Sequence, residues 1–146
     1  MAGNPKIGCA ALSVGDFHEQ VLVEDLTRTQ IVQYAGASGD FNPIHHDETF
    51  ATKAAGYPSV FAHGMLTMGL TGKLLTDWLG DGVLESFGVR FVGQVWPGDT
   101  LTARGTVKSI QEQGSEGLVE IDLVTANQKG EPVVTGNATA LLPRRG

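Results

Sequence analysis

The stretch formed by residues 34–47 holds the residue types that acid–base chemistry needs. Its sequence is YAGASGDFNPIHHD, in which Asp40 stands five positions before His45. Residues five apart lie on different faces of a helix, because helical neighbours are three and four apart. Pro43 fixes its own φ and keeps Asn42 out of the α region, so the chain must bend between the two. The bend predicts a carboxylate and an imidazole that converge, a pair able to hold a water and move its protons.

The same residues could have a purely structural role. A lone aspartate often caps a turn, and a lone histidine often lies on a solvated loop. The combined spacing Gly-Asp-x-Asn-Pro-x-His favours chemistry over that explanation. We expect the neighbouring His46 to point into solvent and Asp47 to cap the helix that follows.

A second motif, AHGMLTMG at residues 62–69, follows the first. Together the two motifs resemble the MaoC-like (R)-specific enoyl hydratase/dehydratase family of hot-dog-fold proteins, over about residues 14–142. They are most similar to the catalytic subunit of the two-subunit actinobacterial type II fatty-acid-synthase (3R)-hydroxyacyl-ACP dehydratase. The resemblance implies reversible hydration of trans-2-enoyl thioesters to (3R)-hydroxyacyl thioesters. The carrier would be coenzyme A or acyl carrier protein, with no cofactor.

The resemblance also assigns roles to residues. It implies that Asp40 and His45 are the catalytic pair, and that Gly64 supplies the backbone amide of the oxyanion hole. Asn42 matches a supporting position that orients the loop. A helix N-terminus suits the third role physically, because its dipole favours the negative charge of an enolate. The missing Cβ of Gly64 would let a thioester approach closely.

Other polar residues receive weaker interpretations. His63 can be a second base, but a structural hydrogen bond at the helix start is the favoured interpretation. His18 stands alone and is given no role. Exposed cations on strands could meet carrier phosphates or an acidic carrier protein, although such cations usually only solubilise; these are Arg90, Arg104 and Lys108.

Composition limits the classes of protein to consider. The 146 residues fit one domain, and 41% hydrophobic with 18% charged residues is typical of a globular protein. A net charge of −6 argues against nucleic acid as a partner. One cysteine excludes an intrachain disulfide, and the zinc patterns are absent, so no metal is predicted. No stretch has membrane-spanning length and no signal peptide is evident, so a cytoplasmic location is expected.

The elements before the second motif are predicted from local signals. Residues 1–12 are expected to be a loose amino-terminal arm, and residues 20–24 a strand. A Thr27–Gln30 capping box, flanked by a staple of Leu26 and Ile31, predicts a helix start. Gly36 and Gly39 are expected to end that helix. A short second helix should follow Asp47 and turn four side chains inward: Phe50, Ala51, Ala54 and Ala55.

The remaining chain predicts one long helix and a sheet. Residues 65–79 carry two apolar rows. Gly69 and Gly72 lower the stability of a helix relative to alanine, which makes sense if a sheet wraps closely around the helix there. Alternating residues then predict strands from 86 to 95, from 101 to 108, from 119 to 123 and from 134 to 140. Tight turns between them argue for antiparallel pairing. The expected fold is α+β, a single hot-dog domain with a curved antiparallel sheet around a long central helix.

Two other classes of function stay open at this point. A hot-dog acyl thioesterase would also bind acyl thioesters, but the Asn-Pro-x-His half of the motif argues against it. A non-catalytic acyl-binding subunit of a heteromeric dehydratase would have no need of Asp40 and His45. Family members of this length pair their sheets, so the resemblance implies a homodimer, or a heteromer with a related hot-dog subunit.

Overall fold

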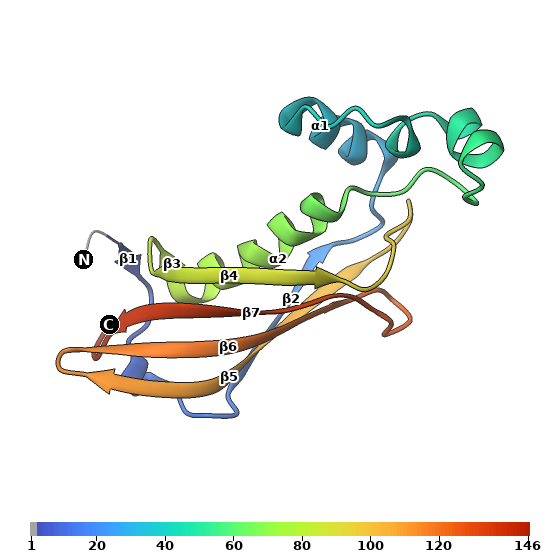
Figure 1. Cartoon of the computed structure of the whole chain (residues 1–146). Coiled ribbons are helices and arrows are strands. Elements are labelled where there is room, and N and C mark those ends of the chain that lie inside the picture. The colour runs from blue at the N-terminus through green and yellow to red at the C-terminus, as the bar shows by residue number, and fades with distance from the viewer. Residues whose placement is uncertain (1–2) are drawn as a thin grey trace.

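The computed structural model describes residues 3–146, and its main feature is a curved five-stranded sheet (Figure 1). The strand order is β2-β5-β6-β7-β4 and every neighbouring pair is antiparallel. The predicted α+β class with an antiparallel sheet is confirmed. The strands are β2 (Phe17–Val23), β4 (Leu84–Phe91), β5 (Leu101–Gln113), β6 (Glu116–Ala126) and β7 (Pro132–Pro143).

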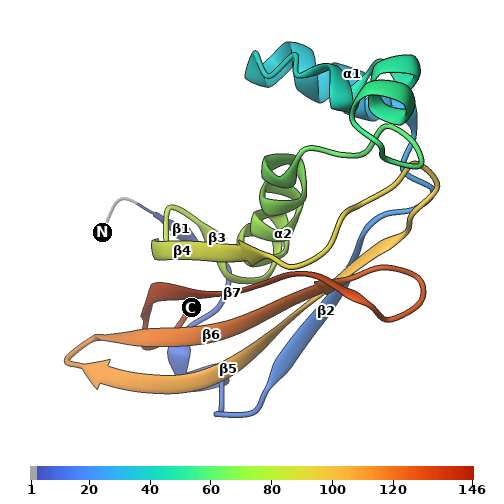
Figure 2. The ribbon, with the colours of Figure 1, turned by 45° about the vertical axis from the view of Figure 1, so that its right-hand side comes forward.

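The central helix α2 (Gly64–Leu79) lies along one face of this sheet, as Figures 1 and 2 show. It begins one residue before the predicted range. Its buried side chains include three leucines of the predicted rows, but also Thr67 and Thr71. Gly69 does not touch the sheet, because a Cβ there would meet nothing within 4 Å. Gly72 does, since a Cβ there would lie 3.2 Å from the Phe87 ring on β4.

The two threonines join the helix to the sheet through buried hydroxyl groups. Thr71 Oγ1 lies 2.9 Å from the carbonyl oxygen of Thr67 and 2.7 Å from Thr125 Oγ1 on β6. Thr71 has one hydroxyl hydrogen, which it donates to that carbonyl, so Thr125 donates to Thr71. Both hydroxyl groups are therefore satisfied without water, and α2 is fixed in its position along β6.

The amino-terminal segment is packed rather than loose. Residues 1 and 2 lie outside the described part, but β1 (Asn4–Pro5) pairs with β3 (Gly80–Asp81) just after α2. The short helix η1 (Cys9–Ala11) then places Cys9, 2% exposed, in the main hydrophobic core. The prediction of a loose arm is therefore wrong for residues 3–12. The segment shows no regular pattern in the sequence, but backbone pairing and a buried thiol hold it in place.

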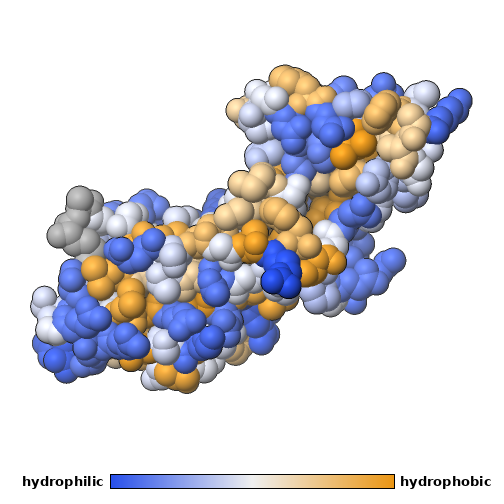
Figure 3. All heavy atoms as spheres, in the orientation of Figure 1, coloured by the Kyte–Doolittle hydropathy of each residue, from blue (hydrophilic) through white to orange (hydrophobic). Residues whose placement is uncertain are grey.

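A helical segment between β2 and α2 projects beyond one end of the sheet, and we call residues 28–63 the overhang. Figures 2 and 3 show it standing apart from the body of the sheet. Its first helix, α1 (Arg28–Ser38), starts with the predicted capping box and ends at Gly39 in the left-handed region, with φ 75°. Gly36 lies inside the helix rather than at its end.

The rest of the overhang is short helical turns. After η2 (Pro43–His45) comes η3, a π-helical turn at Phe50–Ala54, with Asp47 Oδ1 accepting from the Phe50 amide at 3.0 Å. The predicted cap is confirmed, but the inward face is wrong: only Ala51 is buried, at 0% exposure. Phe50, Ala54 and Ala55 are exposed. Arg28 of α1 pairs with Glu48, which ties α1 to this turn.

The return from β4 to β5 is irregular. β4 ends at Phe91 rather than at the predicted residue 95, and Ala62 N donates to Val95 O at 2.8 Å. A tight turn follows Trp96: Gly98 has φ 92° and Asp99 N donates to Trp96 O at 3.0 Å. Within residues 3–146, the helices are too short or too polar to cross a membrane.

Two glycines on neighbouring strands make a matched test of how tightly β4 and β7 approach. A Cβ at Gly136 would lie 2.2 Å from the Gly88 carbonyl oxygen, whereas a Cβ at Gly88 would meet nothing within 4 Å. Gly136→Ala should therefore destabilise the fold by about 1–3 kcal/mol, the usual cost of overpacking. Gly88→Ala should have little effect. Urea unfolding measures both, and equal stability of the two variants would contradict this packing.

Candidate active site

The bend after α1 is built from short-range hydrogen bonds. Asn42 N donates to Asp40 Oδ1 at 3.2 Å, and Ile44 N donates to Asn42 Oδ1 at 3.2 Å. Asp40 N donates to Ser38 Oγ at 3.2 Å. Asp40 and Asn42 thus form successive turns in which a side chain replaces a backbone acceptor. One carboxylate oxygen of Asp40 is held by this turn, and the side chain stays exposed.

His45 lies beneath this bend and is 7% exposed. Its Nδ1 lies 2.6 Å from the carbonyl oxygen of Phe61, whose ring also meets the imidazole edge-on at 5.2 Å. A carbonyl oxygen only accepts hydrogen bonds, so Nδ1 carries the hydrogen. The neutral ring then keeps a lone pair on Nε2, which makes His45 a base of defined orientation.

The structure brings Asp40 and His45 together, with His63 as a third member. A carboxylate oxygen of Asp40 and a ring nitrogen of each histidine lie within 4.8 Å of one another. A water hydrogen-bonded to two of these groups at about 2.8 Å each fits such a separation. The cluster therefore has the geometry for holding one water between a carboxylate and an imidazole.

His63 makes a structural hydrogen bond, as the sequence favoured. Its side chain does not cap α2. Instead Nε2 donates to the Asp40 carbonyl oxygen at 2.9 Å, and the ring stacks on His45 with centroids 3.8 Å apart and planes at 25°. Tyr34 of α1 meets the other side of His63 edge-on at 4.9 Å.

The surroundings of His45 favour its neutral form. Burial of the ring lowers the pKa of His45 below its ordinary value of 6.5, and the nearby His63 and His46 lower it further. The hydrogen bond to Phe61 and the Asp40 carboxylate raise the pKa without reversing that direction. His45 is thus prepared to accept a proton at neutral pH.

The same three residues have to be tested as metal ligands. Metal-bound histidines direct their lone pairs to one point about 2.0–2.1 Å away. The stacked rings of His45 and His63, with planes at 25° and centroids 3.8 Å apart, keep their in-plane lone pairs in separate, nearly parallel planes, which does not favour convergence on one ion. His63 Nε2 also already donates to Asp40. The arrangement suits proton transfer better than coordination, and we expect no metal there.

The N-terminus of α2 borders this cluster. Gly64 is its first residue and directly follows His63. The first amides of a helix have no intrahelical acceptor, and the dipole of a 16-residue helix favours negative charge there. The place of the missing Cβ is occupied by Phe91 at the end of β4, whose ring carbon would lie 3.1 Å from it. The sequence interpretation of this glycine did not foresee that ring.

Two cavities meet at Gly64 and Phe91. One, of about 400 Å³, is lined by α1 and the bend through Tyr34, Ser38 and Asp40. The other, of about 250 Å³, is mainly apolar and reaches Thr67 of α2 and Val134 of β7. The larger cavity is bordered by Asp40 and the smaller one offers hydrocarbon surface, with the α2 N-terminus between them. Such a division suits a ligand with a reactive polar group and an apolar part.

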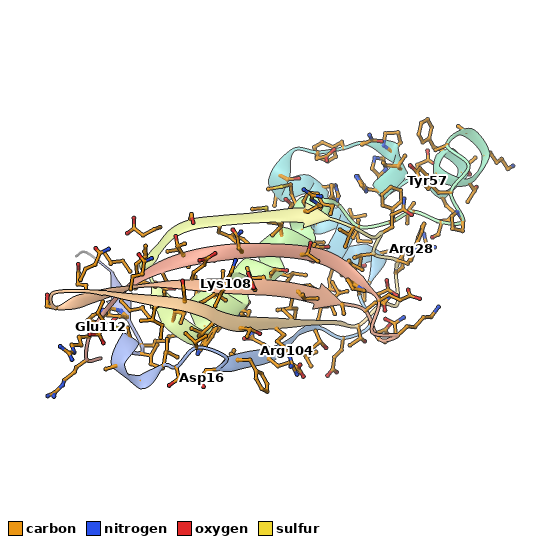
Figure 4. The ribbon with its side chains drawn as sticks, turned by 60° about the horizontal axis from the view of Figure 1, so that its bottom comes forward. Asp16, Arg28, Tyr57, Arg104, Lys108 and Glu112 are labelled. Carbon is orange, nitrogen blue, oxygen red and sulfur yellow. The ribbon has the colours of Figure 1, made fainter. Side chains whose placement is uncertain are left out.

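The other residues considered from the sequence lie outside this cluster. His46 is exposed as expected, although its Nε2 lies 3.0 Å from the Phe41 carbonyl oxygen. His18 stacks on Trp78, far along α2. Arg104 and Lys108 lie on β5, away from the overhang (Figure 4), and pair with Glu19 and Glu120. These pairings leave little support for a phosphate role.

Three contacts were missed by sequence reasoning. The Phe61 carbonyl, the Phe91 ring and the edge of Tyr34 all shape the site. A backbone carbonyl has no sequence signal, because every residue carries one. Phe91 ends a strand whose contact with the helix start depends on tertiary structure. Tyr34 begins the first motif, and that position was the only available signal.

Comparison with known proteins finds one family of relatives. Residues 13–128 match the family model described as MaoC like domain. The chain is 38% identical to 3-hydroxyacyl-thioester dehydratase Y of Mycobacterium tuberculosis over 96 residues, 64% of this chain and 33% of that protein. It is 31% identical to the (R)-specific enoyl-CoA hydratase of Rhodospirillum rubrum over 127 residues, 86% of this chain and 85% of that protein.

Solved structures give the same picture. The (R)-hydratase from A. caviae involved in PHA biosynthesis superposes with TM-score 0.79 at 28% identity, covering 91% of this chain and 98% of that one. The ChsH1–ChsH2 complex from Mycobacterium tuberculosis matches with TM-score 0.75 at 29% identity, covering 90% and 98%. The predicted hot-dog fold is confirmed, and related hot-dog proteins form heteromeric complexes. The chain spans only about a third or less of the first curated relatives, 33% and 23% of their lengths.

The buried, hydrogen-bonded state of His45 generates a prediction that needs no substrate. An NMR titration should find its midpoint below 6.5, with the ring hydrogen on Nδ1 when neutral. Because the folded pKa is lowered, the unfolded chain binds this proton more readily. The stability linked to His45 is therefore present above pH 6.5 and is lost as pH falls through the folded pKa. A midpoint above 6.5 would contradict the described environment.

Proposed function

The chain belongs to the MaoC-like dehydratase family, and we propose that it catalyses the reversible hydration of trans-2-enoyl thioesters to (3R)-hydroxyacyl thioesters. The observation that carries the proposal is the Asp40–His45 pair, in which a carboxylate oxygen and a ring nitrogen lie within 4.8 Å of each other beside the N-terminus of α2. Hydration across an enoyl thioester needs a held water, a proton for C2 and stabilisation of an enolate. This one corner of the molecule offers groups for all three.

In the hydration direction, Asp40 and His45 hold a water against C3 of the substrate. Nε2 of His45 is free to accept because Nδ1 is committed to Phe61. The water loses a proton to this pair as its oxygen bonds to C3, and the pair returns a proton to C2. Dehydration runs the same steps backwards. Asn42 supports the pair by fixing one oxygen of the Asp40 carboxylate.

The negative charge that develops on the thioester oxygen falls to the Gly64 amide. A preorganised N–H at a helix N-terminus stabilises such charge without reorganising during the reaction. The 250 Å³ apolar cavity beside Gly64 offers surface to the hydrocarbon next to the thioester. The carrier is a pantetheine thioester, coenzyme A or acyl carrier protein; the relatives named 3-hydroxyacyl-thioester dehydratase and enoyl-CoA hydratase support a thioester, and the second name supports coenzyme A. The finer resemblance to one actinobacterial dehydratase and the cytoplasmic location stay predictions from the sequence.

The two alternative functions are less well supported. A thioesterase would direct its water to the carbonyl carbon, and a thiol reagent would detect the free carrier that it releases. A non-catalytic acyl-binding subunit would not need a buried imidazole held in one tautomer. We therefore keep the hydratase proposal, with release of thiol as the observation that would favour the first alternative.

The central test uses two substitutions that keep the shape of the site. Asp40→Asn preserves the turn, and His45→Asn preserves a donor to the Phe61 carbonyl while removing Nε2. Each should lower the rate of crotonyl-CoA hydration, followed by loss of enoyl absorbance, by about 10²–10⁴-fold. The double variant should be little slower than either single one, because groups that act on one water are not additive.

Matched controls separate chemistry from folding. Asp122→Asn on the exposed side of β6 and His18→Phe, which keeps an aromatic ring on Trp78, should retain wild-type rates. Since His45 is buried, its variant needs a melting curve beside the rate. A folded His45→Asn with normal turnover, beside an Asp40→Asn that unfolds, would make the bend a structural turn and the proposal wrong.

We also propose that the chain works as a dimer, first as a homodimer and otherwise with a related hot-dog subunit. The sheet ends at β4, and the neighbouring apolar side chains of Met65, Phe91 and Val92 are 56%, 49% and 48% exposed. Such an edge and its apolar border suit pairing with a second sheet. Light scattering should give at least twice the 15.4 kDa chain mass. An active monomer would refute both forms.

A further inference from the structure

His63 has more contacts within the site than the proposed reaction uses. It is 2% exposed, and its Nδ1 is buried without a hydrogen-bond partner among residues 3–146. A buried polar atom without a partner is costly, and an apolar ring of the same shape would avoid that cost. Its remaining contacts indicate what this imidazole contributes.

The first contact fixes the backbone of Asp40. Nε2 of His63 lies 2.9 Å from the Asp40 carbonyl oxygen, and because a carbonyl only accepts, Nε2 carries the hydrogen. Asp40 follows Gly39, whose left-handed φ of 75° ends α1. The hydrogen bond therefore holds the exposed end of the bend from the opposite side of the site.

The second contact sets the plane of His45. The two rings stack at 3.8 Å and 25°, while the Phe61 carbonyl holds His45 by its edge. One contact fixes the direction of the ring and the other its tilt. A second basic ring at this distance also disfavours a positive charge on His45.

The third link is covalent. His63 directly precedes Gly64, and its own carbonyl oxygen accepts from the amides of Leu66 and Thr67 at 3.1 and 3.4 Å. The first turn of α2 thus fixes the backbone of His63. One residue therefore connects the backbone of Asp40, the imidazole of His45 and the helix N-terminus.

We propose that His63 is the positioning residue of the Asp40–His45 pair, holding Asp40 by its carbonyl oxygen and His45 by ring stacking while its backbone places the Gly64 amide beside them. The inference rests on the proposed hydratase function. It assigns His63 no proton transfer to substrate. The two ring contacts have different chemistry, so substitutions can separate them.

The midpoint of the His45 titration depends on every charged or titratable group around the ring. The charged or titratable neighbours that act on it are Asp40, His46 and His63. Tyr34 of α1 contacts His63 rather than His45. On the adjoining η3 segment, Glu48 is paired with Arg28. Among these, His63 alone stacks on the ring, so its removal is the specific perturbation.

Two variants divide the contacts of His63. His63→Gln places an amide N–H where Nε2 stands and keeps the bond to Asp40, but it removes the basic ring. His63→Phe keeps an aromatic face against His45 and removes the bond. For each, kcat and KM on crotonyl-CoA, the pH profile and the NMR midpoint of His45 are measured. His18→Gln, remote on Trp78, is the matched control and should change none of them.

The proposal predicts different effects of the two variants on kcat and on the His45 titration. His63→Phe should lose about 10–10²-fold in kcat, the scale of a small misplacement, with KM nearly unchanged. His63→Gln should recover at least about tenfold of that loss at high pH, because Asp40 is held again. In the same variant the His45 midpoint and the acid limb should move to higher pH, since a basic neighbour is gone.

Wild-type kcat in His63→Phe, or an unmoved His45 midpoint in His63→Gln, would overturn the proposal. A merely structural histidine would lower melting temperature without moving the midpoint. If the wild type does not hydrate crotonyl-CoA, the hydratase proposal fails, while the midpoint still tests the positioning. If neither variant folds, long-range ¹H–¹⁵N spectra of the wild type decide: hydrogen on Nε2 of His63 supports the proposal, and hydrogen on Nδ1 refutes it.

Discussion

The site depends on one hydrogen bond, from Nδ1 of His45 to the carbonyl oxygen of Phe61, 2.6 Å long. It joins the bend after α1 to the segment that leads into α2, sixteen residues later. It also decides which ring nitrogen keeps a lone pair, and hence whether His45 can act as a base toward the site. Without it the imidazole would be free to turn, and burial alone would leave its polar edge unpaired. The surrounding structure therefore has to fix the positions of both His45 and the Phe61 carbonyl.

The overhang and the sheet hold these ends by different means. In the overhang the capping box of α1, the turn at Asp40 and the cap at Asp47 satisfy the backbone locally, and Ile31 and Ala62 pack into a second hydrophobic cluster with residues of the sheet side. The body of the molecule fixes α2 through its buried leucines and the Thr71–Thr125 hydroxyl pair. His63 and Gly64 lie at the junction between the overhang and α2. The overhang is thereby held against a rigid helix, which is how loop residues can be precise enough for chemistry.

The parts of this arrangement that the sequence predicted are those with local signals. Thr27, Gln30 and Gly39 mark α1, Asp47 marks the next turn, and Pro43 makes the bend between Asp40 and His45 necessary. The parts that it missed depend on distant residues or on the backbone. Cys9 looked like part of a loose arm because its packing partners come from β6. Gly69 resembled a packing glycine although it faces open space, and the hydrogen bond of His63 was expected without its distant partner, Asp40.

The central claim is that one water between Asp40 and His45 adds to C3 while the Gly64 amide holds the thioester oxygen. A crystal structure of Asp40→Asn with bound (3R)-3-hydroxybutyryl-CoA, which this variant should turn over slowly, tests it directly. The account predicts the 3-hydroxyl oxygen within hydrogen-bond distance of both the substituted amide side chain and His45 Nε2, and the thioester oxygen on the Gly64 amide. A 3-hydroxyl group turned away from His45, or a thioester carbonyl bound elsewhere, would contradict it.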